Sequence, residues 1–170
     1  MNRPYWSYSR LAQYLRCPLQ FYFERVLQLP RPFISSSLVL GSAVHEALAE
    51  YHHSLTNGRP FGSHQIGSVF LATWKRRQEQ ERIQYRTSEN AAQLIEQGLG
   101  LIDTYLEAYP PTEILAVEHR FTVPLSDRNN HYLDRPLVTI PDLLCQEDNR
   151  LTVVELKTSS RRYNQADIDT

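Results

Sequence analysis

The chain has 170 residues, of which 41% are hydrophobic and 22% are charged, and its formal net charge is -1 at pH 7. These values are typical of a globular protein with one apolar core, and they exclude a disordered or fibrous chain. No apolar run approaches the length of a membrane span, and two cysteines cannot build a disulfide framework. We therefore expect a cytoplasmic protein with no membrane contact. With no overall basic excess, nucleic acid could bind only at a local patch.

The first 110 residues are predicted to be mainly helical, because apolar residues recur there at helical spacing. The expected helices are a short one that Ser9 caps, a second that begins at Pro18, a third over residues 37–55, a fourth that Ser63 caps, and a fifth that Ser88 opens and Pro110-Pro111 ends.

The next part of the chain, residues 111–158, is predicted to form a sheet. Three segments rich in β-branched and apolar residues read as strands, over residues 114–125, 137–145 and 151–157. Together they predict a three-stranded antiparallel sheet beside the helices, and hence an α/β (α+β) fold. Residues 164–170 resemble the approach to a further helix.

The last two predicted strands place three charged side chains on one face of the sheet. Asp148 and Asn149 are suited to a two-residue hairpin turn, which sets Asp142 opposite Glu155 and puts Lys157 on the same face. Directly opposed carboxylates repel each other, whereas a divalent cation between them turns that repulsion into binding. Mg²⁺ and Mn²⁺ prefer carboxylate oxygens, and Lys157 could hold the attacking water or the developing negative charge. The alternative is an exposed hairpin whose charges are solvated.

This pattern resembles the PD-(D/E)XK nuclease superfamily, and within it the RecB-like exonucleases, which include AddB-type nuclease domains and CRISPR-associated exonucleases. The resemblance rests on ordered stretches: Ser7-Tyr8-Ser9-Arg10-Leu11 with Cys17-Pro18, Gly41-Ser42-Ala43-Val44-His45, Val117-Glu118-His119-Arg120-Phe121, Pro141-Asp142, and Glu155-Leu156-Lys157.

The resemblance implies a restriction-endonuclease-like core and a metal-dependent DNA exonuclease of DNA repair and recombination. Its substrate would be single-stranded or have a free end, and a helicase would be a partner. Asp142, Glu155 and Lys157 would be catalytic, and Asp142, Glu155 and His45 would hold Mg²⁺ or Mn²⁺. A CRISPR-adaptation exonuclease and an inactive DNA-binding or assembly module are the alternatives. The family has a further helix and strand, so residues 1–170 are expected to be one nuclease domain that is incomplete at its C-terminus.

Two further residues have a functional and a structural interpretation. Many relatives bind a [4Fe–4S] cluster through a Cys-Pro cysteine, so Cys17 would be one ligand if a longer parent chain carried the other three. Otherwise Cys17 is a small buried residue at a helix start. Glu118 either lies in the cleft with Asp142 or faces solvent on an alternating strand.

The remaining candidates are predicted to be structural. His52 and His53 are expected on the surface, Glu46 is expected to be solvated, and His119 is expected to face the core. The aromatic residues Tyr14, Phe21 and Tyr22 could stack single-stranded bases, but helical aromatics are more often core residues. Arg161 and Arg162 could contact phosphate, although a charged loop is usually solvated.

Overall fold

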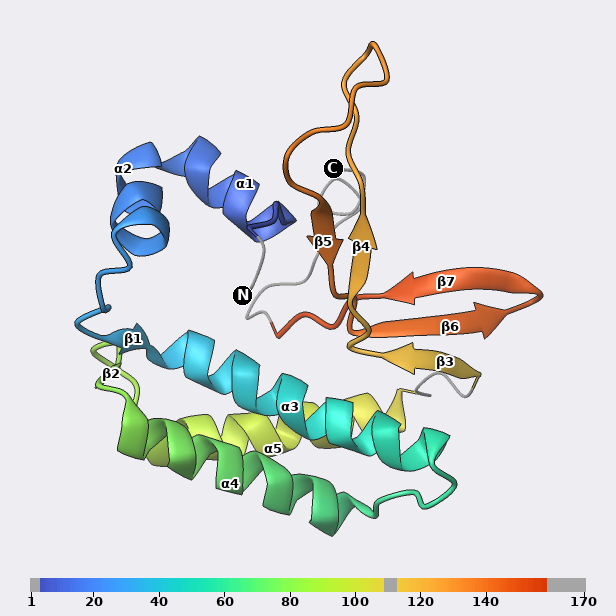
Figure 1. Ribbon diagram of the computed structural model, residues 1–170. Helices are drawn as coiled ribbons and strands as arrows, with labels where there is room; N and C mark the ends of the chain where they lie inside the picture. Colours follow the sequence, from blue (N-terminus) through green and yellow to red (C-terminus); the bar gives the residue numbers. More distant parts are fainter. Residues whose placement is uncertain (1–3, 109–112, 159–170) are drawn as a thin grey trace. The chain divides into compact units, whose positions relative to one another are not determined.

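The computed structural model describes residues 4–108 and 113–158, which form helices and antiparallel strands (Figure 1). The elements, in chain order, are α1 Tyr8–Arg16, α2 Pro18–Phe21, the π-helix η1 Tyr22–Val26, β1 Ile34–Ser35, α3 Ser36–Thr56, α4 Ser63–Gln80, β2 Ile83–Gln84, α5 Ala91–Glu107, β3 Ile114–Val117, β4 Phe121–Val123, β5 Leu137–Thr139, β6 Leu143–Glu147 and β7 Arg150–Val154. The predicted α+β class is confirmed. None of the described helices is both long and apolar enough to cross a membrane.

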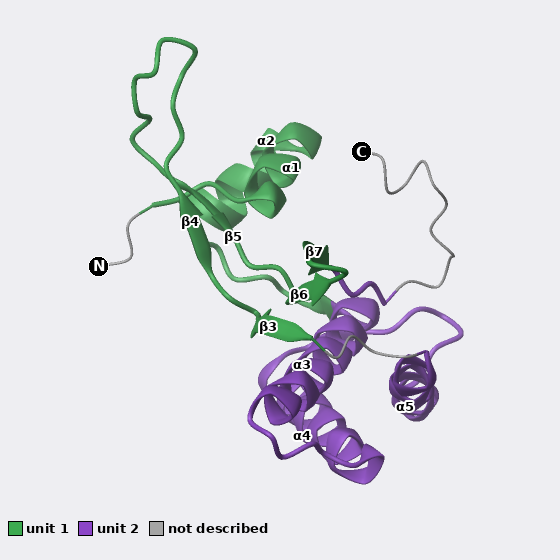
Figure 2. Ribbon diagram, turned by 90° about the vertical axis from the view of Figure 1, so that its right-hand side faces the viewer, with its two compact units in different colours: residues 1–34, 113–154 green, residues 35–112, 155–170 purple. Residues whose placement is uncertain are grey.

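Two compact units divide the chain (Figure 2). The sheet unit comprises residues 1–34 and 113–154, and the helix unit comprises residues 35–112 and 155–170. The predicted features at Pro110-Pro111, Arg161-Arg162 and 164–170 lie outside the described residues.

The helix unit is built from α3, α4 and α5, which pack on one another. Ser35 caps α3 by accepting a hydrogen bond from the Leu38 N–H, and Asn90 caps α5 in the same way through the Gln93 N–H. The helices begin within three residues of their predicted starts. Their apolar faces form a core that includes Val39, Ala43, Val44, Ala47, Ile66, Phe70 and Trp74, all at most 1% exposed. That core fixes α3, on which His45 lies.

Gly98 allows α5 to approach α4 closely. A Cβ atom at this position would collide with the Phe70 ring and would lie 3.0 Å from Leu40 Cδ1. Gly98 is therefore required by packing, although glycine lowers intrinsic helix stability.

The N-terminal helices of the sheet unit begin at polar caps. Ser7, and not the predicted Ser9, caps α1, because its Oγ accepts the hydrogen bond from the Arg10 N–H. Pro18 occupies the first turn of α2, as predicted, and the chain continues directly into η1. A partly buried polar network joins these helices: the Gln13 amide donates to Glu24 at 2.8 Å and its oxygen accepts from Arg25 at 2.9 Å.

Three strands form the antiparallel sheet β3-β6-β7, and β4 pairs with β5 in a second sheet. A three-stranded sheet was predicted, but the prediction of two long strands over 114–125 and 137–145 is wrong. Each divides into two strands that enter different sheets. Glu118 has a φ of 45°, which interrupts the extended backbone after β3, and Pro141 lacks the N–H that would continue a ladder between β5 and β6.

The β6-β7 hairpin has the predicted register. Leu143 pairs with Val154 and Glu147 pairs with Arg150, so Asp148 and Asn149 form the two-residue turn. Both turn residues have positive φ, 46° and 61°, as a type I′ turn requires.

Candidate functional site

Asp142 lies at the break between β5 and β6, directly before the first residue of β6. Asp142 is half-buried, and its backbone carbonyl oxygen accepts a hydrogen bond of 3.0 Å from the Glu118 N–H. Glu118 is exposed. The backbone therefore holds two acidic residues side by side where the two sheets separate, and both interpretations of Glu118 remain compatible with this position.

Glu155 and Lys157 follow β7, which ends at Val154. The prediction that the strand continues to Lys157 is therefore wrong in its last three residues. Lys157 Nζ lies 3.0 Å from Glu155 Oε2, so the two side chains project to the same side of this segment. About half of each side chain is exposed. An exposed ion pair of this kind contributes little to stability.

The hairpin register relates these residues to Asp142. Leu143 and Val154 form the last hydrogen-bonded pair at the open end of the hairpin. Extending the register by one residue, beyond the last observed pair, would place Asp142 opposite Glu155. Asp142 directly precedes β6 and Glu155 directly follows β7, and the convergence of their carboxylates on a metal remains a prediction.

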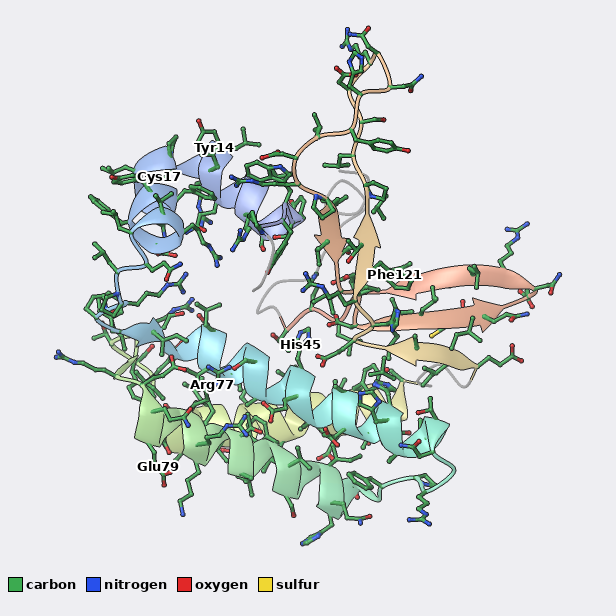
Figure 3. The ribbon with its side chains drawn as sticks, viewed as in Figure 1. Tyr14, Cys17, His45, Arg77, Glu79 and Phe121 are labelled. Carbon is green, nitrogen blue, oxygen red and sulfur yellow. The ribbon has the colours of Figure 1, made fainter. Side chains whose placement is uncertain are left out.

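His45 lies on α3, one helical turn after Gly41 (Figure 3). Residues four apart share one face of a helix. A Cβ atom on Gly41 would lie 2.9 Å from Thr158 Oγ1, so the segment that follows Lys157 packs closely on α3 at this point. Gly41 and His45 therefore lie on the helix face that the end of the Glu155–Thr158 segment contacts.

A cavity of about 330 Å³ lies within the helix unit, beside Thr158. Its polar lining comprises Ser37, Arg86, Glu89, Gln97 and Thr158. The pKa of the Glu89 carboxyl is lowered mainly by a hydrogen bond from the Ser36 hydroxyl, and also by one from the Arg86 N–H. Glu89 therefore stays ionised. The cavity is therefore lined by a positive group, Arg86, and a negative group, Glu89, as well as by Thr158, which follows Lys157.

The predicted metal ligands come from both units. His45 and Glu155 belong to the helix unit, and Asp142 belongs to the sheet unit. Within the described residues, no three His, Cys, Asp or Glu side chains group closely enough to hold a metal ion. The donor chemistry nevertheless suits Mg²⁺ or Mn²⁺, because carboxylate oxygens dominate the predicted set. Glu155 already faces one cation, the ammonium group of Lys157.

Cys17 is the N-cap of α2, where its half-buried Sγ accepts a 3.4 Å hydrogen bond from the Gln20 N–H. The second cysteine, Cys145, is buried in β6, and burial raises the pKa of its thiol. An iron–sulfur cluster needs about four thiolates, and this sequence contains two cysteines. The structural interpretation of Cys17 is correct about the helix start, but the residue is half-buried and not buried.

Several residues differ from the expectations. His52 was predicted to be on the surface but is fully buried, with Nε2 2.8 Å from the Tyr105 hydroxyl. His53 is exposed as expected. Glu46 remains partly solvated, with 39% of its side chain exposed, and it also accepts two hydrogen bonds from Arg76, at 2.7 and 2.8 Å. The Arg76 hydrogen bonds are the main reason that the pKa of Glu46 is lowered.

The strand break also explains a wrong prediction for His119. This residue was expected to face the core, but it is exposed and its ring contacts Phe121 edge-on. Because Glu118 adopts a left-handed conformation, the alternation of sides does not continue through His119. Tyr14 and Tyr22, which were predicted to be core residues, are 52% and 46% exposed.

Sequence reasoning missed one group completely, the arginine–aromatic cluster of Tyr5, Trp6, Arg10, Arg120 and Arg135. Arg10 and Arg120 both lie over the Tyr5 ring, and Arg135 lies over the Trp6 ring. Tyr5, Trp6 and Arg10 lie close together in the sequence, which was a weak indication of an arginine–aromatic contact. The other two arginines are more than 100 residues away in the sequence, so only the fold brings them to the rings.

A family comparison decides how these features should be interpreted. The family model of the PD-(D/E)XK nuclease superfamily matches residues 5–170. The chain belongs to this superfamily. Membership implies a nuclease, and hence a hydrolase with a nucleic-acid substrate, of a kind that generally uses Mg²⁺ or Mn²⁺. The mixed helices and antiparallel strands agree with the restriction-endonuclease-like α+β fold. Searches of curated proteins and of solved structures found no significant match.

Proposed function

We propose that this PD-(D/E)XK protein is a RecB-like, metal-dependent DNA exonuclease that processes DNA with a free end in repair or recombination. The observation that carries the proposal is the β6-β7 hairpin, whose register leads to Asp142 and Glu155, together with the ion pair between Glu155 and Lys157. The ordered sequence motifs support the RecB-like assignment, a cytoplasmic location and a helicase as partner.

In this proposal Asp142, Glu155 and His45 hold Mg²⁺ or Mn²⁺. When bound, such an ion would supply Lewis-acid chemistry, which polarises phosphoryl oxygens and lowers the pKa of a bound water. Lys157 holds the attacking water or stabilises the negative charge that develops on the phosphoryl group. Its 3.0 Å contact with Glu155 keeps the ammonium group beside the carboxylate before substrate binds. Glu118 supports this site through the backbone hydrogen bond to Asp142.

A cleavage assay on labelled DNA tests the proposal. The protein should degrade linear single-stranded DNA with Mg²⁺ or Mn²⁺, should stop when EDTA is added, and should leave circular single-stranded DNA intact. Removing one transition-state contact commonly lowers a rate by ~10²–10³. We therefore expect Asp142→Ala and Lys157→Ala each to lower the rate by at least that factor.

Lys75 provides a matched control, since it is exposed on α4 and is the only other lysine in the sequence besides Lys157. Lys75→Ala should cleave at the wild-type rate. Equal cleavage by Lys157→Ala and Lys75→Ala would remove Lys157 from the site. A folded protein that binds DNA and never cleaves it would favour the inactive-module alternative.

A further inference from the structure

Three arginines from separate segments of the sheet unit gather on two neighbouring aromatic residues. The Cζ atoms of Arg10 and Arg120 lie 4.6 and 4.8 Å from the centroid of the Tyr5 ring. The Cζ atom of Arg135 lies 5.2 Å from the centroid of the Trp6 ring. All three distances are within the range of cation–π attraction.

The backbone holds this arginine–aromatic cluster in place. The Trp6 N–H donates to the Pro136 carbonyl at 2.9 Å, and the Val138 N–H donates to the Trp6 carbonyl at 2.8 Å. These bonds tie residue 6 to the start of β5, beside Arg135. Arg10 also donates to the Tyr5 carbonyl at 3.2 Å. The guanidinium groups are thus positioned before any ligand arrives.

The charges in the cluster are only partly balanced. Arg135 Nε lies 3.3 Å from an oxygen of the exposed Asp134. Neither Arg10 nor Arg120 has an ion-pair partner within residues 4–108 and 113–158. Gathering like charges costs free energy unless an anion joins them. Guanidinium groups match the geometry of phosphate oxygens, and stacking on an aromatic ring leaves their N–H edges available.

The backbone connects the cluster to Asp142 within the sheet unit. Arg120 is two residues after Glu118, whose N–H bonds to the Asp142 carbonyl, and all three residues belong to the sheet unit. Arg10 and Arg120 each lie within 5 Å of one centroid, so their Cζ atoms are less than ~10 Å apart. One DNA strand carries a negative phosphate at every nucleotide, so two guanidinium groups this close can contact neighbouring phosphates of the same strand.

We infer that the arginine–aromatic cluster binds the phosphate backbone of a DNA strand beside Asp142, with Arg10 and Arg120 as the main contacts. The inference rests on the proposed nuclease function and adds how the substrate strand is held. It also accounts for nucleic-acid binding by a chain whose net charge is -1, because the positive charge is local.

The test measures binding without cleavage. A fluorescein-labelled single-stranded oligonucleotide is titrated in EDTA at several salt concentrations, and its anisotropy gives the dissociation constant. Each phosphate contact on a single strand contributes ~0.7 to the slope of log affinity against log salt. The Arg10→Gln/Arg120→Gln variant should therefore lower the slope by ~1.4 and weaken binding at low salt at least tenfold.

Two further variants separate charge from geometry. The Arg10→Lys/Arg120→Lys variant should retain most of the salt slope, because lysine keeps the charge, but should bind more weakly than the wild type. Arg128→Gln is the matched control, because Arg128 is exposed in the same unit, between β4 and β5, and contacts neither ring. It should bind as the wild type does.

Arg10 is half-buried, so its replacement could affect folding, and far-UV circular dichroism checks each variant. If the double variant is unfolded, the exposed Arg120 is tested by Arg120→Gln alone, with an expected slope change of ~0.7. Folded glutamine variants that bind like Arg128→Gln would overturn the inference, even if the protein cleaves DNA. Binding that depends on Arg10 and Arg120 in a protein that never cleaves would overturn the proposed nuclease function alone.

Discussion

The helix unit buries its large apolar side chains, whereas the sheet unit leaves many of them exposed. Of the 15 hydrophobic residues that are buried within the described chain, 12 belong to the helix unit. Of the 20 large hydrophobic residues that are exposed, 18 belong to the sheet unit. The helix unit is therefore stabilised mainly by apolar packing.

The sheet unit depends more on directional contacts. Strand pairing, three cation–π contacts and the polar network around Glu24 connect its segments. Such contacts are sensitive to backbone geometry, salt and pH, whereas apolar packing is sensitive to volume. The two units should therefore respond to different mutations and conditions. Asp142 and the arginine–aromatic cluster belong to the less deeply packed unit, where functional segments are commonly found.

The largest effect is expected from Gly98→Ala, which tests the apolar packing of the helix unit. The added methyl group would collide with Phe70 and press on Leu40. Overpacking of this kind costs ~1–3 kcal/mol in the free energy of unfolding. Urea denaturation followed by far-UV circular dichroism measures the change.

Gly100 offers a control on the same helix, because a Cβ there would have no atom within 4 Å. Gly100→Ala should stabilise the protein by ~0.5–1 kcal/mol, since alanine favours the helix. Equal effects of the two substitutions would show that α5 does not pack tightly on α4 in solution.

A smaller effect is expected from Asn149→Val, which tests the backbone geometry of the sheet unit. Asn149 has a φ of 61° in the β6-β7 turn, and a β-branched residue in this conformation costs ~1–2 kcal/mol. The register that leads to Asp142 and Glu155 depends on this turn. Urea denaturation should show the loss of stability, and the cleavage assay should show a parallel loss of activity.

Asn149→Gly is the matched variant, because glycine adopts positive φ readily. It should keep both stability and activity close to those of the wild type. A hairpin that tolerates valine as well as glycine would not form the type I′ turn.

The smallest effect concerns acid and the polar network of the sheet unit. Hydrogen bonds from Gln20, and then from Arg31, help lower the pKa of Glu24 from 4.5 to about 2. A lowered folded-state pKa stabilises the protein at neutral pH, and this stabilisation is lost as the pH falls from about 4.5 toward 2. In thermal unfolding, Glu24→Gln should be less stable than the wild type at pH 7, and the difference should shrink below pH 4.5.

Glu79 serves as the control for this series, since it is exposed on α4 and has no ion-pair partner within the described residues (Figure 3). Glu79→Gln should follow the wild type at every pH. A constant difference between Glu24→Gln and the wild type from pH 7 to pH 2 would contradict the lowered pKa.

Local patterns in the sequence were sufficient for the helices and for the hairpin. Helical spacing of apolar residues predicted α3, α4 and α5, because this signal repeats within a few residues. The predicted cap Ser63 and start Ser88 were wrong, since Gly62 and Asn90 precede the first residues of α4 and α5. Asp148-Asn149 predicted the turn, and the turn determined the register that leads to Asp142 and Glu155. The order of the family motifs could also be read directly, and it agreed with the superfamily match over residues 5–170.

Tertiary structure decided the features that depend on distant partners. The segments 114–125 and 137–145 look continuous in the sequence, yet each one divides into two strands that belong to different sheets. The division follows from the left-handed backbone at Glu118 and the break at Pro141. His52 is buried, and its ring forms a hydrogen bond with the hydroxyl group of Tyr105, which is 53 residues later in the sequence. Arg120 reaches Tyr5 only through the fold. Hydrophobic pattern and turn chemistry are local properties of a sequence, whereas burial and charge clustering depend on which distant segments meet.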